Sequence, residues 1–566
     1  MKRVFTLVAF LSLVVTAFAA LQCVVGGVVT DVSGPLPGVT VTLTAPGQPA
    51  RTEITDAQGK WLMRGLAPGC YTVTASLEGF NTIRTAINLH DEKPLSVDFT
   101  LTMAAISEAI TVTAEELYHP PANYRHFEDH GFVDTTKEKT TTFAIDVDRA
   151  SYANIRRHLT NGEQPPEDAV RIEEMINYFA YDYPQPEGKD PFAVISEVAS
   201  CPWNAKHRLV RIGVQGRNLE QWRMAPNNLV FLIDVSGSMD EPDRLPLLQQ
   251  AFHVLVDELR AEDRVAIVTY AGEAGLVLPS TSGANKDAIR AAIDALGAEG
   301  STAGEAGIQL AYQVAKDAFV EHGNNRVILA TDGDFNVGVS DVDEMQKLIA
   351  KKRNSGIDLS LLGVGDDPND TLMEMLADKG NGNYAVLDTL QEAKKVFGQE
   401  LTGTLVTIAK DVKVQVVFDP AKVASYRQIG YENRALANED FDDDAKDAGE
   451  LGAGHSVTAL YEIEPRAEAQ GEIATLRLRY KLPRAWRSTL MTTSIVDRGI
   501  NASEASRDFQ FTAAVAQLGM LLRKSPHAGT ATWDDALSLA KIARGEDLDG
   551  TRAELVALIE KAKEVQ

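Results

Sequence analysis

Between residues 227 and 402 the chain alternates short apolar runs with amphipathic stretches of helical period. The run at 229–234 is apolar up to its final Asp, as expected of a strand that is buried on both faces. Such strands, when separated by helices, predict a largely parallel sheet that is covered by helices on both faces. Strands are expected at 229–234, 264–270, 326–331, 358–364 and 384–387, and helices at 245–259, 286–296, 304–319, 342–354, 371–379 and 391–400. In open sheets of this kind ligands bind at the carboxyl ends of the strands.

Oxygen-bearing side chains gather at that edge of the predicted sheet. Asp234, Ser236 and Ser238 follow the first strand, Asp332 follows the third, and Thr302 lies in the loop before the helix expected at 304–319. Two carboxylates and three hydroxyls are hard donors that suit Mg²⁺, with Ca²⁺ and Mn²⁺ as alternatives, and offer little to Zn²⁺ or copper. Helix capping by Asp and Ser would explain one such position. It does not explain three groups of oxygen-bearing residues that follow one another along the chain. The sequence therefore predicts one divalent-cation site.

This set of residues resembles the metal-ion-dependent adhesion site of von Willebrand factor A domains, with its Asp-x-Ser-x-Ser run, distant Thr and distant Asp. The resemblance implies that the serines and the threonine contact the metal. It also implies that Asp234 and Asp332 act directly or through water, and that an acidic side chain of a protein partner completes the octahedron. Ser301 stands beside Thr302, so either hydroxyl could be the ligand.

The loop after Asp332 carries Phe335, Asn336 and Val337, which are expected to shape the surface that meets a partner. Packing within the loop is the equal alternative for these three residues. The partner is expected to be a protein.

Alternating strands flank this region on both sides, at 192–199 and 208–216 before it and at 411–418, 457–464 and 472–480 after it. We expect them to form one β-sandwich into which the metal-binding domain, 227–402, is inserted. The run TFAIDVDRASYANIRR within 140–226 resembles the companion segment of a bacterial von Willebrand A subfamily. Within it, Asp146 and Asp148 are expected to end a strand and cap a helix, a second cation site being the alternative. Segment 403–566 becomes helical after residue 508 and resembles the carboxyl-terminal region of that subfamily.

The amino terminus reads as an export signal over residues 1–19, with a basic start, an apolar run and a small-x-small end. Residues 20–102 alternate apolar and polar positions between Gly/Pro turns and resemble the carboxypeptidase regulatory-like domain, a small β-sandwich. Residues 103–139 are expected to be a linker. The fold class is therefore multidomain, α/β plus all-β, and the location is the periplasm, the cell surface or the medium.

Three cysteines suit an exported protein with one disulfide, and Cys23 with Cys70 is the favoured pair because both lie in the first domain. A lipid anchor at Cys23 is the less favoured alternative, since Gln22 and Ala20 do not fit a lipoprotein signal. No later segment resembles a transmembrane helix.

Composition narrows the class of partner. The 566 residues include 55 Lys and Arg against 80 Asp and Glu, a formal net charge of -25, which disfavours nucleic acid. The acidic run at 439–444 lacks the Gly and closing Glu of a calcium loop, so a solvated loop is expected there. The leading function is cation-dependent protein binding, in adhesion or envelope assembly. A scaffold with a purely stabilising metal is the second reading. A metal-dependent hydrolase is the third and weakest, so no enzyme is expected; the oligomeric state is left open.

Overall fold

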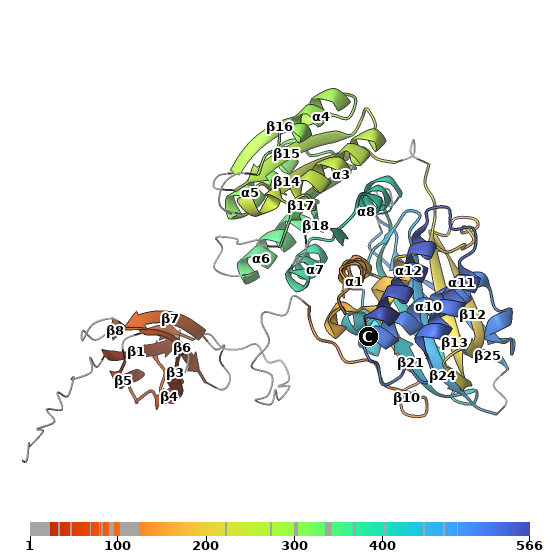
Figure 1. The fold of residues 1–566 in the computed structure, drawn as a ribbon, viewed down its shortest axis with the longest axis horizontal. Helices are drawn as coiled ribbons and strands as arrows, with labels where there is room; N and C mark the ends of the chain where they lie inside the picture. The colour runs from red at the N-terminus through yellow and green to blue at the C-terminus, as the bar shows by residue number, and fades with distance from the viewer. Residues whose placement is uncertain are drawn as a thin grey trace, which may run out of the picture. The chain divides into compact units, whose positions relative to one another are not determined.

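The computed structural model describes residues 23–31, 34–45, 48–67, 69–77, 80, 83–89, 95–101, 124–220, 224–271, 274–298, 304–333, 342–365, 369–399, 403, 406–444, 446, 448–467, 470–483 and 485–565. The chain divides into two compact units, Met1–Pro120 and Pro121–Gln566 (Figure 1). The expected export signal, Thr302, Phe335, Asn336 and Val337 lie outside the described residues.

The first unit is a β-sandwich, as the sequence predicts. One sheet has the order β2 (Gly34–Pro35), β1 (Cys23–Asp31), β5 (Lys60–Leu66), with β8 (Leu95–Ser96) and β9 (Phe99–Thr100) also pairing with β1. The other has the order β4 (Gln48–Ile54), β3 (Thr40–Ala45), β6 (Gly69–Ser76), β7 (Ile83–Leu89). Alternation along β5 places Trp61 and Met63 in the shared core, and Leu66 joins them after the alternation breaks at Arg64 and Gly65.

The cysteines of this unit are not seen to form the predicted bridge. Cys23 lies buried and unbridged in β1, and the side chain of Cys70 lies outside the described residues, so the pairing stays a prediction. Cys201, in the second unit, is also buried and free.

A six-stranded sheet forms the centre of the inserted domain, residues 227–402, which is named the metal-binding domain here after the ion that the sequence predicts for it. Its order is β16 (Ala274–Ser282), β15 (Arg264–Tyr270), β14 (Asn227–Asp234), β17 (Asn324–Thr331), β18 (Asp358–Val364), β19 (Tyr384–Leu387). All neighbours are parallel except β16, which runs antiparallel to β15. The parallel sheet confirms the prediction. Strand β16 was not predicted, because it is an edge strand that exposes Leu276 and Val277 and contains Pro279.

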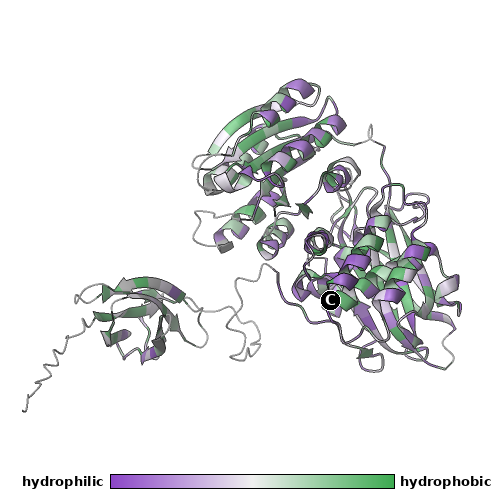
Figure 2. Ribbon diagram, viewed as in Figure 1, coloured by the Kyte–Doolittle hydropathy of each residue, from purple (hydrophilic) through white to green (hydrophobic). Residues whose placement is uncertain are grey.

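Helices cover both faces of this sheet because successive strand residues point to opposite sides. Leu229, Phe231 and Ile233 face α3 (Leu245–Glu258), α4 (Lys286–Asp294) and the last helical segment, α8 (Leu390–Lys394) with its π-helical continuation η4 (Lys395–Gln399). Val230 and Leu232 face α5 (Gly304–Asp317), α6 (Val342–Arg353) and α7 (Asp370–Lys379). Figure 2 shows the apolar strands as green ribbons between helices with purple outer faces.

The two flanks of the metal-binding domain join in one sandwich, here called the frame sandwich. One sheet has the order β10 (Val133–Asp134), β21 (Val423–Ile429), β24 (Ser456–Pro465), β13 (Asn204–Gly216), β12 (Phe192–Cys201). The other has the order β22 (Ala435–Leu436), β11 (Thr140–Ala144), β20 (Thr407–Phe418), β25 (Gly471–Lys481), β26 (Thr489–Asp497), with β23 (Leu451–Gly452) on β20. Because β13 pairs with β24 and β11 with β20, strands from before and after the metal-binding domain share sheets, which confirms the predicted insertion.

Helices from both flanks complete the frame. They are α1 (Ala150–Thr160), α2 (Ile172–Asn177), α10 (Arg507–Leu522), α11 (Trp533–Ala543) and α12 (Thr551–Glu564), and most of their apolar residues share one core. None of the helices in the described part of the chain combines the length and hydropathy needed to span a bilayer.

Helix α1 also belongs to the metal-binding domain, where Ala150 and Ala153 pack with the residues of α7 and β19. Figure 1 shows α1 beside α7 and α8. The guanidinium of Arg156 on α1 forms ion pairs with Asp388, just before α8, and with Glu392 in α8 at 2.8 Å. It also pairs with Glu554 of α12 at 3.0 Å. One buried arginine thus ties the metal-binding domain to the frame.

Candidate metal centre

Strand β14 delivers Asp234 to the carboxyl edge of the sheet, where it is fully buried. Its Oδ1 accepts a hydrogen bond from the backbone N–H of Ser236 at 2.9 Å, and its Oδ2 accepts one from the Thr331 hydroxyl at 3.2 Å. Burial raises the pKa of Asp234, the bonds from Ser236 lower it, and the nearby charge of Asp332 raises it. The carboxylate is therefore fixed in one orientation by its neighbours.

The loop after β14 turns sharply and places two hydroxyls side by side. Met239 is buried in the core and its N–H donates to the carbonyl of Ser236 at 3.0 Å, which anchors the turn. The hydroxyl oxygens of Ser236 and Ser238 lie 3.1 Å apart. Ser236 is buried and Ser238 is exposed, so the hydroxyl pair runs from the protein interior to the surface.

Asp332 follows β17, the parallel neighbour of β14, and so lies at the same edge. Its side chain is 3% exposed, and Oδ2 accepts from Arg244 Nη1 at 2.8 Å. The same guanidinium nitrogen donates to the backbone carbonyl of Ser238 at 2.8 Å. Arg244 therefore connects the two loops that carry the predicted ligands.

The structure places Asp234, Ser236, Ser238 and Asp332 in one continuous group at the edge that the sequence predicts. The sequence did not predict three further residues of this group, Thr331, Arg244 and Tyr270. The side chain of Tyr270 hydrogen-bonds Asp234. Arg244 did leave a signal. It is the N-cap residue of α3, where the helix dipole disfavours a cation, so a carboxylate nearby was to be expected.

The donor set decides which ion the group can hold. The described residues contain no cluster of three or more His, Cys, Asp or Glu side chains suited to a metal, so the two serine hydroxyls must supply part of any shell here. Oxygen donors with two carboxylates fit a hard cation such as Mg²⁺ and do not fit the nitrogen and sulfur preference of zinc. Binding of the ion itself stays a prediction.

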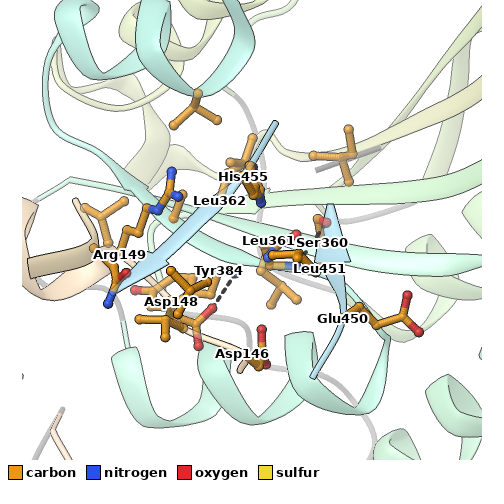
Figure 3. A pocket seen from close by; sticks show the side chains of 18 of the residues that line it. Asp146, Asp148, Arg149, Ser360, Leu361, Leu362, Tyr384, Glu450, Leu451 and His455 are labelled. Atoms are coloured by element: carbon orange, nitrogen blue, oxygen red, sulfur yellow. Dashed lines mark hydrogen bonds between the residues drawn. The ribbon is translucent and has the colours of Figure 1, made fainter. Parts of the chain in front are cut away.

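Asp146 and Asp148, the second candidate pair, serve a different purpose. Asp148 Oδ1 accepts the backbone N–H of Tyr384 at 3.2 Å, the dashed bond in Figure 3, and Oδ2 pairs with Arg434 at 2.8 Å. Arg434 also pairs with Asp146 at 3.7 Å, Glu374 at 3.4 Å and Asp378 at 2.8 Å. The capping interpretation is wrong, because the N-cap of α1 is Arg149 and no side chain caps it. Here these carboxylates join two parts of the chain.

A cavity of about 90 Å³ lies beside this ion cluster. Its lining combines strand residues of the metal-binding domain, such as Ser360 and Leu361, with Glu450 and His455 of the frame (Figure 3). Burial raises the pKa of Asp146 to about 6 and that of Glu450 to about 7. The cavity therefore lies at a join between two domains where carboxylates are poorly solvated.

The acidic run at 439–444 is largely exposed, as expected, and it also forms ion pairs with the frame sandwich. Arg479 of β25 pairs with Asp442 at 3.0 Å and with Asp444 at 3.2 Å, and Lys413 of β20 donates to the carbonyls of Asp440 and Asp443. The acids cover a basic stripe on the outer face of the frame sandwich.

Comparison with known proteins agrees with this architecture. Residues 228–399 match the model of the von Willebrand factor type A domain and residues 120–211 a von Willebrand factor model. Residues 24–102 match the carboxypeptidase regulatory-like domain, and residues 403–565 match the model described as "Uncharacterized protein YfbK, C-terminal". The sheet and its helices, residues 228–399, are thus a von Willebrand factor type A domain.

The particular family follows from one relative. The chain is 43% identical to "Uncharacterized protein YfbK" of Escherichia coli over 468 residues, 78% of this chain and 81% of that protein. It therefore belongs to the bacterial von Willebrand factor A family that includes YfbK. It is also 32% identical over 195 residues to "Uncharacterized protein sll0103" of Synechocystis, covering 34% of this chain and 45% of that protein. A solved von Willebrand factor type A structure from Catenulispora acidiphila aligns over 66% of this chain and 91% of its own at 17% identity, with a TM-score of 0.38.

Proposed function

We propose that this protein binds other proteins through one divalent cation held at the carboxyl edge of its sheet, outside the cytoplasm. The observation that carries the proposal is the meeting of Asp234, Ser236, Ser238 and Asp332 at that edge. Membership of the von Willebrand factor A family supports a role in protein interaction. The export signal expected at residues 1–19 supports adhesion or envelope assembly as the setting.

The proposed partner contributes an acidic side chain. Mg²⁺ prefers an octahedral shell of oxygen atoms. Ser238 is exposed, so one side of the group reaches the surface, where a carboxylate from outside would complete the shell. Thr302, or Ser301 beside it, would add a hydroxyl from the loop before α5. The loop of Phe335, Asn336 and Val337 would then meet the partner around the ion.

A stabilising metal in a scaffold is the second candidate. The bonds from Arg244 to Asp332 and to the Ser238 carbonyl favour it, because they join the same two loops that a stabilising ion would join. A hydrolase is the weakest reading. No Gly-x-Ser-x-Gly run surrounds either serine, and Ser236 stands where phosphoaspartate chemistry would need a second Asp.

The test is capture of proteins from an envelope extract by the immobilised full chain, with Mg²⁺ or with a chelator. We expect specific capture in Mg²⁺ and its loss both in chelator and in Asp234→Ala/Ser236→Ala. Asp240→Ala is the matched control, since Asp240 is an exposed carboxylate in the same loop. Capture that survives the chelator would favour the scaffold. Hydrolysis of a phosphate or ester substrate that disappears in the double variant would favour the enzyme.

A further inference from the structure

The hairpin of β25 and β26 ends in an apolar tip, defined here as Leu482, Trp486 and Leu490. The last paired residues are Tyr480 and Thr489, so Leu482 and Trp486 lie in the connection beyond the sheet. Trp486 is 93% exposed, and Leu482 and Leu490 are each 47% exposed. Tryptophan usually buries most of its large surface, so its exposure here, with two exposed leucines within nine positions of one hairpin, is unusual.

The charged residues within the connection itself, positions 481–490, are all basic. No acidic residue occurs between positions 481 and 490, while the sequence has arginines at 484 and 487. Arg487 is exposed, and residue 484 lies outside the described part of the chain. This local charge contrasts with the net charge of -25 for the whole chain.

The acids nearest the hairpin are already bound to other groups. Asp411 pairs with Lys481 at 2.7 Å. Asp442 and Asp444 pair with Arg479, and Asp444 also accepts from the Ser488 hydroxyl at 2.6 Å. Arg487 is exposed in the connection and takes part in none of these ion pairs.

We propose that the apolar tip docks on a phospholipid bilayer. Tryptophan favours the boundary between headgroups and acyl chains, because its ring is apolar and its N–H can bond to polar groups there. Leu482 and Leu490 add apolar area, and Arg487 meets the lipid phosphates. A basic residue near an anionic surface contributes about 1 kcal/mol, so the tip supplies a weak, reversible contact that orients the protein.

Leu548 is a second exposed apolar side chain, and its acidic surroundings distinguish it from the apolar tip. Leu548 is 96% exposed in the turn before α12, but Glu546, Asp547 and Asp549 surround it in the sequence. Anionic headgroups repel such a turn. Leu548 is thus a matched control for an exposed apolar side chain that is flanked directly by acidic residues.

The experiment is sedimentation of the full chain with vesicles of phosphatidylcholine and phosphatidylglycerol in equal parts. Trp486→Ala/Leu482→Ala should weaken vesicle binding by about tenfold or more, because two exposed apolar side chains lose their contact with lipid. Arg487→Glu should weaken vesicle binding more at low salt than at high salt. Leu548→Ala should bind vesicles as the wild type does. Quenching of tryptophan fluorescence by brominated lipid should fall in Trp486→Ala.

Three results would overturn the proposal. They are absence of wild-type binding to these vesicles, equal binding by the wild type and Trp486→Ala/Leu482→Ala, and equal loss in Leu548→Ala. Tip-dependent capture of a protein without vesicle binding would assign the tip to a protein partner instead. All of these side chains are exposed, so the variants are expected to fold, and an unchanged thermal unfolding midpoint checks this.

Discussion

Two acidic regions of the second unit use their carboxylates in opposite ways. One is the group of Asp234, Ser236, Ser238 and Asp332, called the metal edge here after its predicted ion. There Asp234 and Asp332 are held by hydroxyls, a backbone N–H and one arginine that is partly exposed. At the join between the domains, Arg434 binds four carboxylates and is itself nearly buried. Acidic residues therefore do not identify a cation site by number alone. What distinguishes the metal edge is the mixture of carboxylates with hydroxyls on a loop that reaches the surface.

Replacement of Arg434, whose guanidinium lies among the carboxylates at the join, should have the largest effect on stability. Arg434→Met leaves Asp148, Asp146, Glu374 and Asp378 without their buried partner. We expect the free energy of unfolding to fall by about 3–5 kcal/mol, measured by urea unfolding.

The control for this prediction is the exposed pair of Lys541 and Glu560, whose side chains are half exposed. Lys541→Met should cost no more than about 1 kcal/mol. Equal losses in the two variants would show that the buried cluster contributes no more than a surface ion pair.

Substitution of the predicted ligands should abolish the stabilisation by Mg²⁺ but leave the protein folded. Mg²⁺ at about 100 times its Kd should stabilise the wild type by about 2.7 kcal/mol, because the ion binds the folded state alone. Asp234→Ala/Ser236→Ala should gain nothing, and Asp240→Ala should respond like the wild type. Thermal unfolding with and without Mg²⁺ measures the effect, and a full gain in the double variant would contradict it.

The carboxylate of Glu450, a partly buried residue that lines the cavity at the join, should make the join sensitive to pH. Its pKa is raised to about 7 by burial and by the charge of Asp358, above the usual value of 4.5. A raised pKa means that the folded state holds the proton more tightly, so its contribution to stability is complete below the unfolded pKa and is lost as pH rises through about 7.

Glu450→Gln, which mimics the protonated form, should therefore stabilise the protein at about pH 8 by on the order of 2 kcal/mol and change little at about pH 5. Urea unfolding at the two pH values measures this difference. The exposed Glu472→Gln serves as control and should shift stability by less than about 0.5 kcal/mol at either pH. A gain in Glu450→Gln that is the same at both pH values would contradict the account.

The smallest effect concerns the third hydroxyl. If Thr302 is the ligand, Thr302→Ala should weaken Mg²⁺ binding by about tenfold, or about 1.4 kcal/mol, while Ser301→Ala should change it little. Calorimetric titration distinguishes the two hydroxyls. The reverse result would assign the ligand to Ser301, and no effect in either variant would remove this loop from the site.

The sequence predicted the sheet well because its strands are continuously apolar and buried on both faces. The bounds of β18 and β19 agree with the expected ranges, while β16, an edge strand with exposed apolar residues and a proline, left no such pattern. The loop residues of the metal edge could be predicted because they follow strands directly. The ion cluster of Arg434 could not, because its members come from segments that are distant in sequence and periodicity carries no information on which charges meet.

Calorimetric titration of the metal-free full chain with Mg²⁺ tests the central claim most directly. We expect one ion to bind per chain, binding to disappear in Asp234→Ala/Ser236→Ala, and binding to persist in Asp240→Ala. Absence of binding to the wild type, or equal binding to the double variant, would contradict the assignment of the metal edge.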